Sequence, residues 1–465
     1  MTTKANSTRR DFLKTLGLGA AVMALPDTLT SGDKPNVVVI LTDDLGSGDL
    51  TAYSASDMRT PNVDKFIAAG MRFDSFYANC PVCSPTRASL LTGRYPDLVG
   101  VPGVIRTHIT DNWGYLSPQA ILLPQLLKRA GYHTALVGKW HLGLTSPNTP
   151  NERGFDHFHG FLGDMMDDYC NHRRHGFNYM RLDDKEIDPE GHATDLFTQW
   201  AIDYLRERSR RKQPFFLYLA YNAPHAPIQP PQEWLDRVKQ REKGIADKRA
   251  GLVALVEHLD AGIGKVLDTL DATGLRDNTL VIFTSDNGGQ LNLGSSNGPL
   301  RSGKGDMFEG GIRVPMAAAW PGHIKAGSRS DRMAMMMDLL PTICETAGVK
   351  SEHEIDGRSL LPTLTGNSRP EDERVLFWVR REGGNRYGGR AFYAARQGDF
   401  KLLQNTPFEP LELYSLRDDP KEQKPLDRKH PMYAKLFTAL QGHITQSGAI
   451  PWQKYPVNLD EPLTH

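Results

Sequence analysis

The sequence predicts an α/β protein with a large, mostly parallel sheet between helices, and a smaller antiparallel sheet with a helix near the C-terminal end. Short, continuous apolar runs alternate with long amphipathic patterns through most of the chain, as expected of strands buried on both faces. Strand patterns separated by turns follow one another toward the C-terminal end, which indicates antiparallel strands. At 465 residues, the chain is long enough for one large and one smaller domain.

The first segment, residues 1–32, is expected to be an export signal and a linker outside the fold. Arg9 and Arg10 precede Phe12-Leu13-Lys14 and a mildly apolar run, a pattern that resembles a twin-arginine signal. The apolar run is too short to span a bilayer. We therefore expect the twin-arginine export machinery as a partner, a periplasmic or extracellular location, and no stable membrane insertion.

Charge and cysteine content exclude several classes of protein. The 55 basic and 55 acidic residues give no net charge, so no global field favours nucleic acid or an anionic membrane. Four cysteines are too few for a disulfide scaffold. One bridge, Cys80–Cys170 or Cys170–Cys344, fits this number, but we expect free buried thiols instead.

The predicted elements follow in chain order through a catalytic domain, residues 33–365, and a C-terminal subdomain, residues 366–465. In the first domain we predict strands at 37–42, 131–141, 215–221 and 280–284, and helices at 60–69, 118–130, 193–208, 246–270 and 333–347. Residues 146–192 are predicted to be rich in loops. In the subdomain we predict strands at 375–380, 392–396 and 400–403, and a final helix at 431–446.

Polar side chains stand at the ends of four predicted strands. They are Asp43-Asp44, Lys139 with His141, His225, and Asp286-Asn287. In an open α/β sheet, ligands bind where the carboxyl ends of the strands meet, so we expect these groups to lie together. Adjacent carboxylates after a buried strand need a partner, such as a hard cation. Each group alone would be interpreted as a solvated turn or surface residue.

The stretch Pro81–Arg94 contains the most specific pattern in the chain. Cys83 is followed by Pro85 and Arg87, and then by an apolar run that ends at Thr92-Gly93-Arg94. Pro85 suits the first turn of a helix. Cys83 is therefore expected at or near a helix N-terminus, where free N–H groups and the helix dipole favour anions. A lone cysteine in this position would be interpreted as structural, so a functional role for Cys83 depends on the residues around it.

This stretch, Cys-x-Pro-x-Arg followed by Leu-Leu-Thr-Gly-Arg, resembles the signature of the type I sulfatases, members of the alkaline-phosphatase superfamily. Residues 131–141 resemble the second signature of that family, and the likeness runs from about Asn36 to about Pro420. It implies an alkaline-phosphatase-like fold, sulfuric ester hydrolysis, and the oxidation of Cys83 by a maturase to formylglycine (3-oxoalanine). Several stretches look most like arylsulfatase A and N-acetylgalactosamine-6-sulfatase.

The resemblance also implies roles for individual residues. Four hard oxygen donors would bind one Ca²⁺: Asp43, Asp44, Asp286 and Asn287. Lys139 and Lys304 would bind sulfate oxygens, and Arg87 would hold the modified Cys83. Two histidines, His141 and His225, would act as base and acid. The resemblance makes His141 the base and His225 the acid, although the sequence leaves the reverse assignment open.

The substrate is expected to be a sulfated carbohydrate, either a polysaccharide or an oligosaccharide. Cationic and imidazole groups gather in one loop, namely His172, Arg173, Arg174 and His175. Further arginines lie in the C-terminal subdomain, namely Arg380, Arg381, Arg386 and Arg390. Such groups suit anionic sugars, and the alternative is that they only solvate loops.

Three other functions fit parts of the sequence. A general arylsulfatase would need only the sulfate pocket. A phosphatase or phosphonate monoester hydrolase of the same superfamily usually carries more histidine and aspartate ligands, for two transition metals. A carbohydrate-binding protein without activity would not need the complete set from Asp43 to Lys304.

Overall fold

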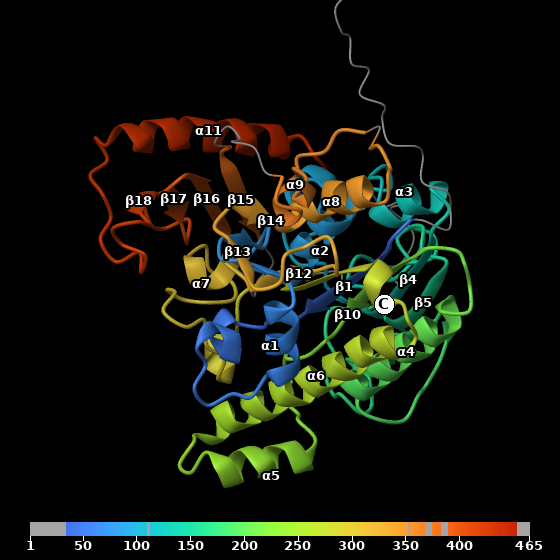
Figure 1. Ribbon diagram of the computed structural model, residues 1–465. Helices are drawn as coiled ribbons and strands as arrows, with labels where there is room; N and C mark the ends of the chain where they lie inside the picture. Colours follow the sequence, from blue (N-terminus) through green and yellow to red (C-terminus); the bar gives the residue numbers. More distant parts are fainter. Residues whose placement is uncertain (1–33, 109–111, 352, 368–373, 383–388, 453–465) are drawn as a thin grey trace, which may run out of the picture.

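A ten-stranded sheet runs through the centre of the molecule (Figure 1). The computed structural model describes residues 34–108, 112–351, 353–367, 374–382 and 389–452. The strands, in their order across the sheet, are β13 (Ser328–Ser330), β2 (Met71–Phe73), β12 (Met316–Ala319), β11 (Thr279–Ser285), β1 (Asn36–Thr42), β10 (Phe215–Ala220), β4 (His133–Lys139), β5 (His157–Phe161), β8 (Met180–Leu182) and β9 (Lys185–Glu186). The middle of the sheet, from β11 to β5, is entirely parallel.

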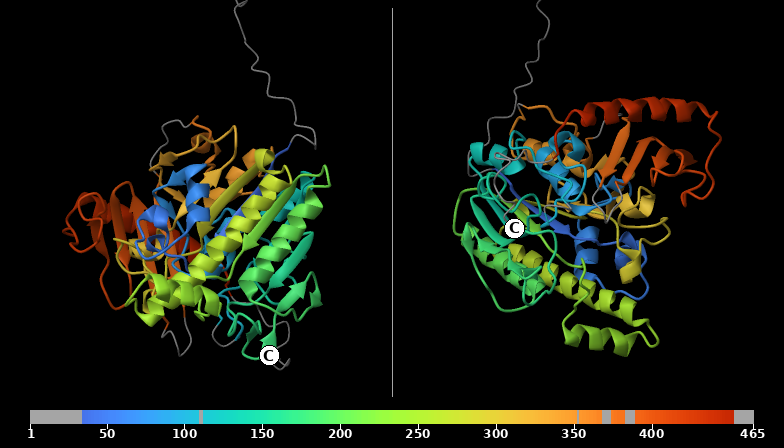
Figure 2. Two further views of the ribbon diagram at one scale, coloured as in Figure 1. Left: turned by 60° about the horizontal axis from the view of Figure 1, so that its bottom comes forward. Right: turned by 180° about the vertical axis from the view of Figure 1, so that it is seen from behind.

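Helices cover both faces of this sheet because its central strands are apolar on both sides. In β1, Val37, Val39 and Leu41 belong to one core cluster, whereas Val38 and Ile40 belong to the other. The first face carries α2 (Cys83–Thr92), α3 (Leu123–Arg129), α8 (Leu339–Thr346) and α9 (Leu361–Leu364). The second carries α1 (Pro61–Ala68), α4 (Ala193–Arg208) and α6 (Asp247–Ala272), with α5 (Gln232–Arg241) outside α6 (Figure 2). The predicted α/β class is confirmed.

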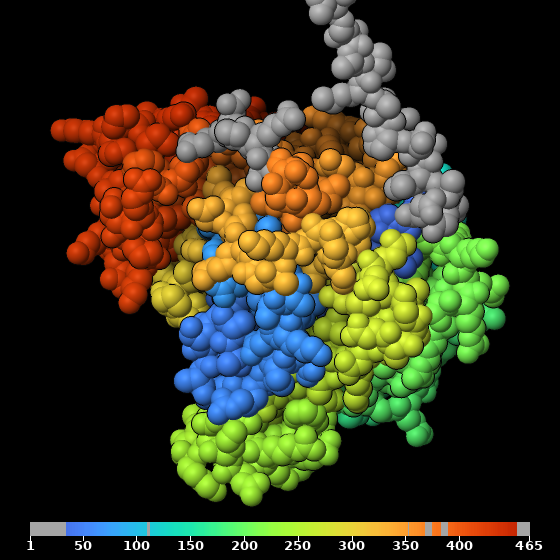
Figure 3. Space-filling model, in the orientation of Figure 1, coloured from blue at the N-terminus to red at the C-terminus, as the bar shows by residue number. Residues whose placement is uncertain are grey.

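A four-stranded antiparallel sheet follows, in the order β15 (Leu376–Arg381), β16 (Ala391–Gln397), β17 (Phe400–Gln404) and β18 (Glu412–Ser415). Helix α11 (Pro431–Gly448) packs on it through Leu436 and Leu440. The sheet also packs on the central body, where the rings of Tyr77 and Trp378 meet edge to face at 5.5 Å. Figure 3 shows this C-terminal part, in red, at the upper left of the molecule. The predicted small sheet and helix are confirmed, and the division at residue 365 stays a prediction.

Several segments differ from the prediction. The helix predicted at 118–130 begins only at Leu123, and the helix predicted at 333–347 only at Leu339. The second begins late because the buried Asp338 carboxylate accepts the Met335 N–H at 2.8 Å and holds the preceding residues in a 3₁₀ turn. The loop-rich segment 146–192 contributes β5, which extends the parallel sheet beside β4.

The cysteines form no bridge in the structure. Cys80, Cys83 and Cys344 are buried free thiols, and Cys170 is an exposed one. Neither bridge considered from the sequence is present, and the expectation of burial is wrong for Cys170. Among the described residues, no helix combines the length and apolarity needed to cross a bilayer. The segment interpreted as an export signal, residues 1–32, lies outside the described residues.

Candidate active site

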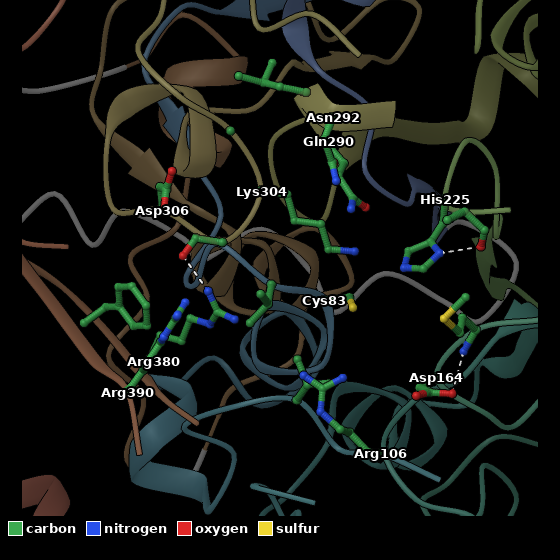
Figure 4. A pocket seen from close by; sticks show the side chains of 18 of the residues that line it. Cys83, Arg106, Asp164, His225, Gln290, Asn292, Lys304, Asp306, Arg380 and Arg390 are labelled. Atoms are coloured by element: carbon green, nitrogen blue, oxygen red, sulfur yellow. Dashed lines mark hydrogen bonds between the residues drawn. The ribbon is translucent and has the colours of Figure 1, made fainter. Parts of the chain in front are cut away.

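The carboxyl ends of the neighbouring strands β11, β1, β10 and β4 bring polar side chains into one site. The residues that follow or end these strands are Asp286, Asn287, Asp43, Asp44, His225 and Lys139, and all six are buried. Cys83, the first residue of α2, lies beside them, and Lys304 reaches the site from the loop before α7 (Glu309–Ile312) (Figure 4). The convergence expected from the strand ends is therefore observed.

The acidic residues form a compact group of oxygen donors. Asp43, Asp44 and Asp286 each place a carboxylate oxygen within 4.8 Å of the others. Asn287 Nδ2 donates to Asp44 Oδ1 at 2.7 Å, but Asp43 Oδ1 and Asn287 Oδ1 are buried without a hydrogen-bond partner. A buried oxygen without a partner is costly. Carboxylate and amide oxygens arranged in this way fit a hard divalent cation such as Ca²⁺.

Two lysines lie against these carboxylates. The Lys139 ammonium binds the Asp43 carboxylate, and Lys304 Nζ lies 2.8 Å from Asp44 Oδ2. Burial alone would raise the pKa of Asp43, but the surrounding positive charges, Lys139 foremost, together outweigh it and lower that pKa below its usual range. Desolvation alone would lower the pKa of Lys304, but the surrounding negative groups, Asp44 foremost, together outweigh it and raise that pKa. Lys304 therefore stays charged.

Arg87 is fully buried and turned toward the acidic group. Its Nη2 lies 2.8 Å from Asp286 Oδ2 and 3.3 Å from Asp43 Oδ2, and its Nη1 donates to the Lys139 carbonyl at 3.2 Å. The role that the resemblance implies for Arg87, holding the modified Cys83, stays a prediction. Burial and the charge of Asp43 raise the pKa of Asp286 to about 7. Additional positive charge, as from a cation, would favour its ionised form.

Cys83 lies at the floor of a cavity of about 970 Å³. The residue before it, Val82, has extended backbone, so Cys83 is the first residue of a ten-residue helix, close to the predicted position. Its side chain is buried, with the residue 4% exposed, and burial raises the pKa of the thiol to about 11. The thiol therefore stays protonated at neutral pH and is a weak nucleophile without modification.

The two histidines differ in which ring nitrogen is engaged. His141 Nε2 donates to the Ile105 carbonyl at 2.7 Å, which leaves Nδ1 as the lone-pair nitrogen, buried without a partner. His225 Nδ1 donates to the Ala226 carbonyl at 2.7 Å, and its Nε2 lies 3.6 Å from Asp44 Oδ2. Burial lowers the pKa of both imidazoles, so both are neutral at rest.

Only part of the cationic loop that was predicted to bind substrate, residues 172–175, lies at the cavity. Arg174 and His175 line the cavity. Arg173 instead pairs with Asp188 at 2.7 Å on the surface, and the buried His172 donates from Nε2 to the Gly191 carbonyl at 2.9 Å. Two of the four residues therefore lie at the cavity. Arg173 and Arg174 are the two residues of β6 (Arg173–Arg174), which pairs with β7 (Phe177–Asn178), and side chains that follow one another in a strand point to opposite faces, which separates these two.

The C-terminal arginines are divided in the same way. Arg380 and Arg390 line the cavity, where Figure 4 shows them on the side of Cys83 opposite His225 and Asp164. Arg381 instead donates to Ser447 Oγ at 3.2 Å. Arg386 lies outside the described residues.

Several residues that no sequence pattern marked also line the cavity. They are Arg106, Asp164, Gln290, Leu291, Asn292, Asp306, Asn405 and Phe408. Gln290 follows the run Asn287-Gly288-Gly289 directly, and that proximity is a signal the sequence does carry. The others come from loops whose path is set by tertiary packing, so the sequence alone offers no sign of them.

Comparisons with known proteins agree with this geometry. The family model described as "Sulfatase" matches residues 35–349, and the model "N-sulphoglucosamine sulphohydrolase, C-terminal" matches residues 303–449. N-acetylgalactosamine-6-sulfatase of Mus musculus is 37% identical over 415 residues, which cover 84% of this chain and 74% of the relative. Arylsulfatase A of Homo sapiens is 33% identical over 382 residues, 77% of this chain and 73% of the relative.

A similar solved structure carries a sugar ligand. The crystal structure of Ps i-CgsB in complex with k-i-k-neocarrahexaose aligns with a TM-score of 0.81 and 31% sequence identity. The alignment covers 89% of this chain and 93% of that chain. The likeness therefore extends over both the central sheet and the C-terminal sheet.

Proposed function

Because the chain belongs to the sulfatase family and is thus a sulfuric ester hydrolase, we propose that it removes O-sulfate from carbohydrates with a nucleophile made from Cys83. The observation that supports this most is the position of Cys83, at the floor of a large cavity beside Lys139 and Lys304. A carbohydrate, rather than a small aryl ester, is supported by the names of the relatives and by the sugar in the similar structure.

The sulfate ester would sit over the first turn of α2. Oxidation of Cys83 by a maturase would give formylglycine, an aldehyde, and its hydration would supply a carbon with two hydroxyls. One hydroxyl could attack sulfur while the sugar oxygen leaves. Loss of a proton from the second hydroxyl would then re-form the aldehyde and expel sulfate. Lys139 and Lys304 would hold the anionic sulfate oxygens as point charges, which stabilises the charge that develops during transfer. The N-terminal N–H groups of α2 favour the same anion.

A metal site is part of the proposal. Asp43, Asp44, Asp286 and Asn287 would bind one Ca²⁺, and the buried unpartnered oxygens of Asp43 and Asn287 support this set. The bound cation would supply positive charge beside the reacting sulfate. Arg87 would keep the carboxylates in position through its contacts with Asp286 and Asp43.

The histidines would move the protons. His141 has a buried Nδ1 lone pair without a partner, which suits a base. His225 Nε2 lies on the side of Asp44, where it could contact the sulfate and protonate the leaving oxygen. The hydrogen bonds of the two rings differ, and this difference favours His141 as base and His225 as acid.

The outer parts of the proposal concern substrate contact and location. Arg174 and His175 would contact the sugar beyond the sulfate, since both line the cavity. The domain division, with a signal at 1–32, a catalytic domain at 33–365 and a C-terminal subdomain at 366–465, belongs to the same proposal. So does export to the periplasm or the outside by the twin-arginine route.

A selectivity measurement tests this function. We expect kcat/KM for a sulfated sugar to exceed that for the matching phosphate ester, and for a phosphonate monoester, by at least ~100-fold, because Asp43, Asp44 and Asp286 offer hard oxygen donors for Ca²⁺. A preference for phosphate or phosphonate would replace the proposal with the phosphatase alternative. A preference for aryl sulfates over all sulfated sugars would reduce it to a general arylsulfatase.

A further inference from the structure

The wall of the cavity that comes from the C-terminal sheet carries an exposed aromatic ring. Phe408 lies in the turn between β17 and β18 and is 86% exposed, yet it lines the same cavity as Cys83. Among the described residues, the large apolar side chains that are exposed are Phe177, Leu291 and Phe408. Leu291 lines this cavity as well. A single exposed apolar side chain needs no explanation, but two at the mouth of one polar cavity indicate a ligand surface.

The turn that carries Phe408 is held firmly. Asn405 accepts the Met307 N–H at 2.7 Å and donates to Asp306 Oδ1 at 2.9 Å, so the base of the turn is tied to the loop that carries Lys304. Within the turn, the Gln404 side chain donates to the Glu409 carbonyl at 2.7 Å. A ring on a fixed backbone loses little freedom on binding, which makes it an effective contact.

Depth separates this ring from the reacting centre. Cys83 is 4% exposed at the floor, whereas Phe408 is at the rim. At about 970 Å³, the cavity lies at the upper end of the range for small-molecule sites, ~300–1,000 Å³. It therefore has room for more than the sulfated ring, and Phe408 meets what lies beyond that ring.

We propose that Phe408 is a specificity residue that packs against the sugar next to the sulfated one, which makes oligosaccharides better substrates than monosaccharides. A pyranose ring presents C–H groups on its face and hydroxyls at its edge. The aromatic face suits the first, and polar groups that line the same cavity, such as Arg390, Gln290 and Asn292, suit the second (Figure 4). This inference rests on the proposed function.

The test compares substrates that share one sulfated sugar. Sulfated galactose and sulfated N-acetylgalactosamine are each assayed as a monosaccharide and as the end of a tetrasaccharide, with an aryl sulfate alongside. In Phe408→Ala, we expect kcat/KM to fall roughly tenfold further on the tetrasaccharide than on the monosaccharide. The loss should appear in KM, because the contact is made equally before and during the reaction. Phe408→Tyr keeps the ring and should keep most of the tetrasaccharide activity.

Phe177→Ala is the matched control, because Phe177 is 53% exposed but does not line the cavity. It should behave as wild type on every substrate. Equal losses on monosaccharide and tetrasaccharide, or no loss in Phe408→Ala, would overturn the inference. The inference would also be overturned if the wild type cleaved aryl sulfate or sulfated monosaccharides but showed no higher kcat/KM on either tetrasaccharide than on the matching monosaccharide. A wild type without any sulfate ester hydrolysis would instead overturn the proposed function, and this inference with it.

Discussion

At the scale of single residues, the site is a balance of buried charges. Asp43, Asp44 and Asp286 face Lys139, Lys304 and Arg87, and buried charges of this kind persist only when they are paired or bound to an ion. The unpartnered oxygens of Asp43 and Asn287 are the part of this balance that the protein does not satisfy by itself. A bound cation would stabilise the site most at these two oxygens.

Replacing Asp286 tests the cation directly. Asp286→Ala should remove Ca²⁺ and lower kcat by at least ~100-fold, because the metal and Arg87 lose a shared carboxylate. Elemental analysis of the purified protein measures the metal apart from activity. Asp271→Ala, at an exposed aspartate, is the control and should keep both. Full Ca²⁺ content in Asp286→Ala, or stoichiometric zinc or iron in wild type, would contradict this ligand set.

The location of a residue in the fold could be predicted only where a general rule connects it to the residue's position in the sequence. Asp43, Lys139, His225 and Asp286 were predictable because the ends of parallel strands meet at one edge of the sheet. Phe408 was not, because its place at the cavity depends on how the turn after β17 packs on the loop of Lys304. The same limit explains why Arg173 and Arg174, adjacent in sequence, separate in space.

At the scale of elements, a buried ion cluster joins the small sheet to the active-site loop. Lys401 of β17 lies 2.9 Å from Glu309 Oε1 and 2.8 Å from Glu422 Oε1. Glu309 begins α7, the helix that follows the Lys304 loop. Burial alone would raise the pKa of Glu309, but the surrounding positive charges, Lys401 foremost, together outweigh it and lower that pKa to about 2. Glu309 therefore stabilises the fold above its ordinary pKa near 4.5, and this contribution is lost as pH falls toward 2.

Removing the lysine should reverse that pH dependence. Lys401→Met removes the cation that two buried carboxylates share and should lower the free energy of unfolding by ~3–5 kcal/mol at pH 7. In the variant, the carboxyl pKa values rise above their unfolded values, so the deficit should shrink between pH 7 and pH 5. Urea denaturation at both pH values measures this. An equal loss of unfolding free energy at both pH values would contradict this prediction. Lys435→Met, at an exposed lysine, is the control, and its free energy of unfolding should stay within ~0.5 kcal/mol of wild type.

Long, regular elements were the ones that could be predicted. The helix over 193–208 matches α4 in both bounds, because its apolar spacing is regular and polar segments flank it. Strand β5, His157–Phe161, lacks the β-branched residues that mark a buried strand, so the sequence predicts a loop there. The start of α8 depends on contacts of Asp338 with the Met335 and Arg358 N–H groups, and no local pattern reveals these.

At the scale of the whole molecule, two units share one cavity. The central sheet supplies the floor with Cys83 and the charged groups, and the C-terminal sheet supplies Arg380, Arg390 and Phe408. This arrangement separates chemistry at the floor from substrate choice at the rim. Changes in the C-terminal sheet are therefore expected to alter the substrate range while the floor is preserved.

Sulfate release from a sulfated oligosaccharide, by wild type and by Cys83→Ala made with a maturase, tests most directly whether Cys83 supplies the nucleophile. Wild type should release inorganic sulfate, and Cys83→Ala should keep its fold but less than about 1% of the rate. Cys80→Ala is the matched control, since it removes a buried thiol that does not line the cavity. A Cys83→Ala variant that retains a larger share of the rate would show that another group performs the reaction.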